Sequence, residues 1–136
     1  SKIGSETISD CLDLIETSKA KFIEQDQSEA TYAKKIDKGE AKINWKEDAL
    51  KIIAKINGLY PNPGVWFLFQ GERYKVLRAT LSEAEGQSGK VLDDNFTIAC
   101  GVKSIKIQEI QRQGRNKQKA KEFLLGSKIK KDLVLS

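Results

Sequence analysis

Residues 65–78 have the sequence VWFLFQGERYKVLR, in which two apolar-rich runs flank a turn at Gly71. Residues 65–69 and 74–78 favour β-strands, and a glycine between them suits a tight connection. The stretch therefore predicts a β-hairpin. Side chains that alternate along the first run share the face expected to meet the core: Val65, Phe67 and Phe69. We expect Trp66 on the other face to be a packing residue, with stacking on a nucleic-acid base as the alternative.

The segment before this hairpin has the pattern of a helix. Asn44 and Glu47 have the spacing of a capping box. Apolar residues then recur at helical spacing: Ala49, Ile52, Ile53 and Ile56. Asn57-Gly58 is a suitable C-terminus, and Pro61 and Pro63 forbid continuation. We therefore predict one amphipathic helix that ends in a stiff turn.

The segment after the hairpin predicts a barrel. Residues 81–90 are polar and indicate a loop. We expect short strands at residues 91–92, 96–100, 104–110 and 133–135, and a short helix at residues 120–125. The fold class is therefore mainly β with flanking helices, a small antiparallel OB-like barrel preceded by a helix. Strand number alone leaves an SH3-like barrel open.

The first residues have a different character. Ser5 is a suitable N-cap, and an amphipathic stripe follows it: Ile8, Cys11, Leu12 and Ile15. Such a short helix needs a surface to cover. We expect residues 1–17 to be a detached helix left from a preceding domain, residues 18–36 a basic and polar linker, and residues 37–136 the barrel domain.

Composition excludes several kinds of site. The chain has no histidine, so the usual acid/base group and a frequent zinc ligand are missing. We expect no catalytic residue, no metal site and no bound cofactor within this chain. Cys11 and Cys100 are far apart and are expected to be reduced, buried thiols. No apolar run is long enough to predict a membrane span, and we expect a cytoplasmic protein.

The net charge is +5, and the charged residues are unevenly distributed along the chain. Residues 1–30 contain three lysines and seven acidic residues, whereas residues 103–136 contain ten basic and three acidic residues. A basic end of this kind is typical of a segment that faces a polyanion, although a solvated surface is the simpler alternative. Two groups of cations are candidates: a linker-side cluster of Lys34, Lys35, Lys38 and Lys42, and a tail-side cluster of Arg112, Arg115, Lys117, Lys119 and Lys121. In a closed barrel, the two clusters are expected to join into one basic groove.

Five ordered stretches carry a family resemblance. They are YAKKI (32–36), AKINW (41–45), INGLYPNPG (56–64), IQEIQRQGR (107–115) and EFLLG (122–126). In order and spacing, the chain from about residue 32 to residue 126 resembles the C-terminal domain of methionyl-tRNA formyltransferases. Gly58 stands where that family usually has Arg, and Gln118 where it often has Met. Both departures weaken a residue-by-residue transfer of tRNA contacts.

The resemblance implies a function. In that family, a Rossmann-like N-terminal domain binds 10-formyltetrahydrofolate, the co-substrate of the whole enzyme, and carries the catalytic residues. An OB-like C-terminal domain helps to hold the initiator methionyl-tRNA. The chain is then the tRNA-binding part, inactive without the catalytic domain. Two alternatives remain open: the equivalent domain of another folate-dependent formyltransferase or hydrolase, acting on a sugar nucleotide or formyltetrahydrofolate, and a stand-alone OB-type adaptor for nucleic acid or protein.

Overall fold

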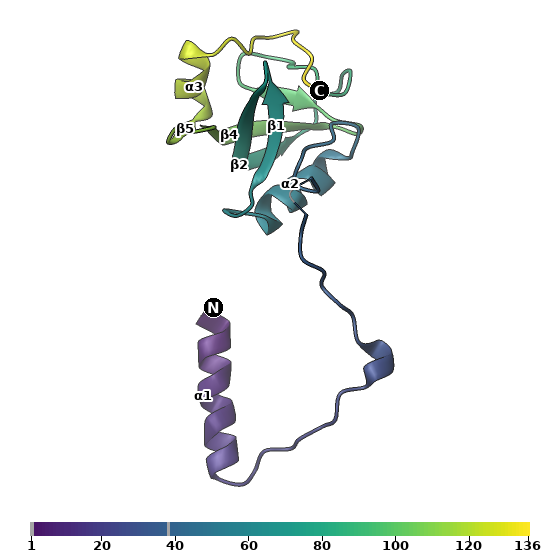
Figure 1. Cartoon of the computed structure of the whole chain (residues 1–136), viewed down its shortest axis with the longest axis vertical. Helices are drawn as coiled ribbons and strands as arrows, with labels where there is room; N and C mark the ends of the chain where they lie inside the picture. The colour runs from purple at the N-terminus through teal and green to yellow at the C-terminus, as the bar shows by residue number, and fades with distance from the viewer. Residues whose placement is uncertain (1, 38) are drawn as a thin grey trace. The chain divides into compact units, whose positions relative to one another are not determined.

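The computed structural model describes residues 2–37 and 39–136, which divide into two units at Lys34 and Lys35 (Figure 1). The first unit contains helix α1 (Lys2–Glu16) and a 3-10 turn, η1 (Gln27–Glu29). No residue of α1 is buried within the described chain, so the expectation of a buried thiol at Cys11 is wrong. The predicted N-cap at Ser5 is also wrong. The Ser5 hydroxyl lies inside the helix and donates to the Lys2 carbonyl at 2.8 Å.

The second unit is an antiparallel sheet with helices beside it (Figure 1). Its strands have the order β1-β2-β4-β3, and β5 pairs with the free part of β4. This curled half-barrel confirms the mainly β, OB-like prediction. Its elements are α2 (Ala49–Gly58), β1 (Val65–Phe69), β2 (Glu72–Ser82), β3 (Thr97–Ala99), β4 (Ser104–Arg112), β5 (Lys117–Lys119) and α3 (Ala120–Gly126).

The predicted hairpin is confirmed as β1 and β2. Phe69 pairs with Glu72, and the two turn residues, Gln70 and Gly71, have φ angles of 52° and 77°. Positive φ at both positions matches the right-handed twist of the flanking strands. Phe67 and Val65 are fully buried, whereas Phe69 is only partly buried against the core. The alternation therefore identified the core face of β1.

A bulge keeps the long strand β2 facing the core. Val76 pairs with Ile110, but the next buried pair is Ala79 with Ile107, because the register shifts around Arg78. An extra residue in a strand shifts by one position the set of side chains that point toward the core, and it bends the sheet. The sheet can thus curl around a single core. Aromatic rings fill that core from both ends, with centroids 5.6–5.7 Å apart in the pairs Phe67–Tyr74, Tyr74–Phe123 and Phe96–Phe123.

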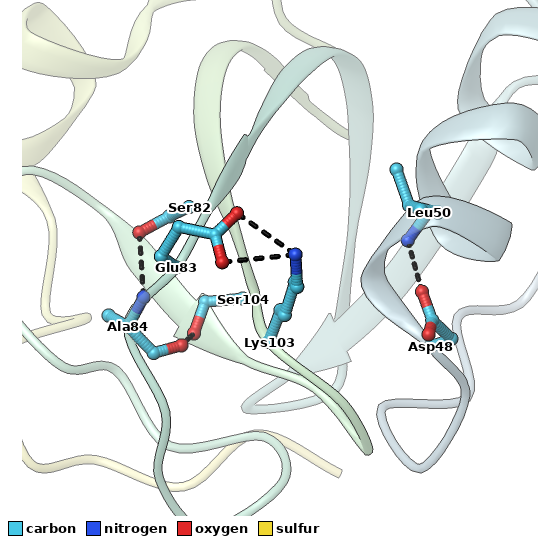
Figure 2. Close-up of polar contacts among 7 residues, drawn as sticks. All are labelled: Asp48, Leu50, Ser82, Glu83, Ala84, Lys103 and Ser104. Carbon is cyan, nitrogen blue, oxygen red and sulfur yellow. Dashed lines mark hydrogen bonds and ion pairs between the residues drawn. The ribbon is translucent and has the colours of Figure 1, made fainter.

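Helix α2 is capped by Asp48, not by Asn44. The Asp48 carboxylate accepts from the Leu50 amide at 2.7 Å (Figure 2). Asn44 instead forms a turn further upstream, accepting from the Lys46 amide at 3.1 Å. The helix ends at Gly58, as predicted, and its buried residues join the core: Ala49, Ile52 and Ile56.

The far end of β2 is tied to β4 by polar contacts. Glu83 forms an ion pair with Lys103 at 3.0 Å, and the Ser104 hydroxyl donates to the Ala84 carbonyl (Figure 2). Strand β2 therefore runs on to Ser82, into the segment predicted as loop. The pair with Glu83 also neutralises one cation of the basic end.

Two predicted strands are not formed as strands in the structure, and one observed strand was not predicted. Residues 91–92 and 133–135 form only isolated bridges, Val91 with Ile98 and Lys90 with Val134. Strand β5 was not expected, because Lys-Gln-Lys has no apolar alternation. It forms where β4 offers unpaired backbone groups, and such pairing cannot be read from a short polar sequence.

Candidate nucleic-acid interface

Cross-strand pairing aligns five residues on one face of the sheet. Lys42 forms a bridge to Trp66, Trp66 pairs with Lys75, Lys75 with Gln111, and Gln111 with Lys117. Directly paired residues point to the same side of a sheet. Their sequence neighbours Ala41, Ile43, Val65, Phe67, Tyr74, Val76 and Ile110 are buried. This set, the outer row, therefore faces away from the core and spans roughly 20 Å across the strands.

The outer row contains three lysines and no carboxylate. Lys42 and Lys117 are exposed, and Lys75 is half-exposed. The stem of Lys75 passes over Gly64, which has a φ of +74° and where an added Cβ would come within 3.2 Å of the Lys75 Cδ. Gly64 thus serves both the turn and the close approach of this lysine.

An arginine lies on the aromatic member of the row. The Cζ of Arg73 is 4.3 Å from the centroid of the Trp66 ring, a cation–π contact. Trp66 is half-buried, so the ring is a packing surface for Arg73. The guanidinium remains exposed and adds a fourth positive charge beside the row.

A second row on the same face is compensated. Arg78 pairs with Glu109, and Glu109 pairs with Lys119. A carboxylate between two cations reduces the local positive potential. Lys119 is therefore a weaker candidate for an anion contact than Lys117, two residues before it.

A groove of about 700 Å³ lies on the opposite side, between the hairpin turn, β5 and α3. Within it, Arg112 Nη2 lies 2.6 Å from Glu72 Oε1, and the Tyr74 hydroxyl donates to Glu72 Oε2 at 2.9 Å. The hydrogen bond from Arg112, followed by that from Tyr74, lowers the pKa of Glu72. The hydrogen bond from Glu72 in turn raises the pKa of Arg112. Burial, more than the bond to Glu72, raises the pKa of Tyr74.

The groove is chemically mixed. Its lining includes the cations Arg112, Arg115 and Lys128, but also the carboxylates of Glu72 and Glu122. A phosphate entering it would meet both signs of charge, and Arg112 already has an anionic partner. The groove is therefore less suited to a polyanion than the outer row.

The predicted clusters are rearranged by the fold. The sheet places Lys42 of the linker-side cluster on one face with Lys117 of the tail-side cluster. Arg112 and Arg115 line the groove, and Lys121 lines a separate depression with Asp93 and Asp94. Lys34 and Lys35 are exposed, and Lys38 lies outside the described residues. Among the described residues of the second unit, the candidate cations thus lie on an outer face, in a mixed groove and in a separate depression.

Sequence reasoning missed Lys75 and Arg73. Both lie in the hairpin whose alternation was recognised, and that alternation already placed Lys75 opposite the core face. The missing information was the pairing of β2 with β4 and of residue 42 with β1, which lines up residues far apart in the chain. A charge count along the sequence cannot supply it.

Other kinds of site are not evident in the part of the chain that the structure describes. No group of three histidine, cysteine or acidic residues there could hold a metal ion, and no helix there is long and apolar enough to cross a membrane. Cys100 is buried, as predicted, and burial raises the pKa of its thiol to about 11. A thiol of that pKa is a poor nucleophile near neutral pH.

Comparisons with known proteins place these features in a family context. Residues 35–128 match the family described as "Formyl transferase, C-terminal domain". The methionyl-tRNA formyltransferase of Pelagibacter ubique is 50% identical over 93% of this chain and 41% of its own length. That of Rhodopseudomonas palustris strain BisB18 is 36% identical over 98% of this chain and 44% of its own length. The chain thus spans less than half of these curated relatives.

Solved structures show the same fold in a more distant protein. A variant of HypX from Aquifex aeolicus superimposes with a TM-score of 0.70 at 19% identity, over 93% of this chain and 25% of that one. HypX has also been solved in complex with tetrahydrofolic acid, with a TM-score of 0.63 at 19% identity over 88% of this chain and 23% of that one. At this identity the likeness is one of fold.

Proposed function

Because this chain belongs to the formyl transferase C-terminal domain family, we propose that it holds the tRNA substrate of an enzyme that formylates Met on initiator tRNA. The observation that carries the proposal is the outer row, three lysines aligned across the sheet with no carboxylate among them. Lysines spaced across a face suit the repeated phosphates of an RNA backbone. The relatives that match most of the chain are named methionyl-tRNA formyltransferases.

In the proposed enzyme, this chain holds the substrate and a separate catalytic domain performs the chemistry, in keeping with the composition. A chain without histidine offers orientation and electrostatic affinity, and proton transfer belongs to a catalytic domain outside these residues. We assign the formyl donor, 10-formyltetrahydrofolate, to that domain as well, with no folate contact from this chain. A cytoplasmic location accords with this role in translation initiation.

The proposed contacts are Lys42, Lys75 and Lys117. Lys34, Lys35 and Lys38 remain predicted contacts outside the outer row. Lys119 and Lys121 are weaker candidates because acidic residues lie beside them: Glu109, Asp93 and Asp94. Phosphate contacts of this kind position an RNA without reading its bases.

Binding of initiator tRNA to the 136-residue chain at two salt concentrations tests the proposal. We expect weak, strongly salt-dependent binding. Changing Lys42, Lys75 and Lys117 together to Gln should lower the slope of log affinity against log salt by about three. The control changes three exposed lysines away from the outer row, Lys51, Lys130 and Lys131, to Gln.

Equal loss in both triple variants would mean that net charge alone drives binding, and the outer row would have no special role. If the unchanged chain binds tRNA no better than a neutral control protein, the sugar-nucleotide or hydrolase alternative gains support. Adding a catalytic domain of the family should restore formylation, and the fragment alone should show none.

A further inference from the structure

A small hollow lies beside the outer row, where β4 ends and turns toward β5. It encloses about 260 Å³ and is lined by Arg73, Lys75, Gln111, Arg112, Gln113 and Gly114. These lining residues include three cations and two side-chain amides, but no carboxylate. We infer that this hollow binds one phosphate group, and that in the proposed function it receives a bridging phosphodiester of the RNA lying across the outer row.

The guanidinium of Arg73 is held before any ligand arrives. Trp66 supports Arg73 from one face, with 4.3 Å between the Cζ and the ring centroid. That contact occupies the face of the guanidinium and leaves its N–H edges directed elsewhere. Arg112 contributes to the wall of the hollow, but its guanidinium is paired with Glu72 in the groove, with Nη2 at 2.6 Å from Oε1. An anion that meets this pre-oriented fork loses less affinity to side-chain ordering than one that meets mobile lysines alone.

The backbone fixes the two arginines relative to each other. The Gln113 amide donates to the Arg73 carbonyl at 2.9 Å, which continues the β2–β4 pairing past the end of β4. The Arg115 amide closes the turn by donating to the Arg112 carbonyl at 3.0 Å, with Gly114 at a φ of 70°. Sheet pairing and a tight turn therefore define the hollow.

Charge separates the hollow from the larger groove. Even with Glu72 counted against Arg112, the hollow retains the positive charges of Arg73 and Lys75. The groove offsets its three cations with Glu72 and Glu122. An arginine fork matches two phosphate oxygens at once, and the side-chain amide of Gln113 can donate to a further oxygen. The Gln111 amide already donates one N–H to the Arg115 carbonyl at 2.9 Å, which helps to hold the turn. The chemistry of the lining thus favours a phosphate.

Titration of the 15N-labelled chain with inorganic phosphate, against chloride at matched ionic strength, tests the site. We expect saturable shifts of the Gln113 and Gly114 amide signals with phosphate only. Arg73→Gln should weaken phosphate binding about tenfold, the usual size for loss of a hydrogen bond to a charged group. Arg73→Lys, which keeps the charge but loses the fork, should recover only part of that loss.

Arg78→Gln is the matched control, because it removes the same group from the same strand outside the hollow. Its phosphate affinity should stay within about twofold of the unchanged chain. Thermal unfolding of each variant shows whether it remains folded. Shifts that do not saturate, or equal weakening by Arg78→Gln and Arg73→Gln, would overturn the site.

RNA trinucleotides with and without a 5′-phosphate show whether the hollow binds a bridging phosphodiester or a terminal phosphate. A bridging phosphodiester predicts that both compete equally with inorganic phosphate. Competition only by the 5′-phosphorylated form would overturn the assignment to the RNA backbone.

The two proposals can fail separately. If phosphate binding does not saturate but tRNA binding still depends on the outer row, the phosphate site in the hollow is wrong and the proposed function stands. If phosphate saturates but tRNA does not bind, the RNA assignment and the proposed function both fail.

Discussion

The two faces of the sheet use the same kinds of residue for different purposes. On the inner side, Arg112 is paired with the carboxylate of Glu72 beside an aromatic core. On the outer side, Lys42, Lys75 and Lys117 lie in a row without a carboxylate among them. The position of a cation in the strand pairing, more than the local density of positive charge, therefore distinguishes a structural ion pair from a candidate ligand contact.

The inner face should respond to packing changes. Phe67→Ala should lower the free energy of unfolding by about 3–5 kcal/mol, because the ring is fully buried between Trp45 and Tyr74. Urea unfolding followed by Trp fluorescence measures this loss. A cost below about 1 kcal/mol would show that the inner face is not the core of this fold.

The two lysines of β5 compare a cation that has a carboxylate beside it with one that has none, on the same face of the sheet. Lys117→Gln should weaken tRNA binding by up to about tenfold and Lys119→Gln by less, because Glu109 compensates Lys119. Fluorescence anisotropy with labelled tRNA at low salt separates the two effects. A larger loss of affinity for Lys119→Gln than for Lys117→Gln would show that Glu109 does not weaken the contribution of Lys119.

The carboxylate of the second row should oppose RNA binding. Glu109→Gln should strengthen tRNA binding by about two- to threefold at low salt, with the gain disappearing at high salt. The same anisotropy assay measures it. Weaker binding in this variant would mean that Glu109 positions Arg78 or Lys119 for a contact.

The smallest expected effect is on the pH dependence of stability, and it comes from Glu72 in the groove. The pKa of Glu72 is lowered from 4.5, so the ionised carboxylate stabilises the fold above that value. This contribution is lost as the pH falls through the lowered pKa. Thermal unfolding between pH 6 and pH 3 should therefore show a steeper fall for the unchanged chain than for Glu72→Gln. Identical curves would show that the pair with Arg112 contributes nothing measurable.

Much of the fold followed from local pattern. The alternation of Val65 and Phe67 predicted the hairpin and its core face, and the helical spacing predicted α2 with its end at Gly58. The helix starts were less certain because several residues near each start can accept a backbone hydrogen bond. Asp48, not Asn44, caps α2.

The candidate site was harder to predict, because it depends on partners distant in sequence. Lys42 and Lys117 were expected in separate clusters, and only strand pairing places them on one face with Lys75. The ion pair of Arg112 with Glu72 joins residues forty positions apart, and sequence spacing carries no sign of it. Non-local pairing therefore decides which cations are available to a ligand.

Two double variants of equal charge decide whether RNA is held by the outer face or by the groove. Lys42→Gln with Lys117→Gln changes the outer row, and Arg115→Gln with Lys128→Gln changes the groove. Each lowers the net charge of +5 by two. Initiator tRNA affinity at one low salt concentration should fall about tenfold or more for the outer pair and by less than about threefold for the groove pair. Equal losses, or a larger loss for the groove pair, would show that the outer face is not the surface that holds the RNA.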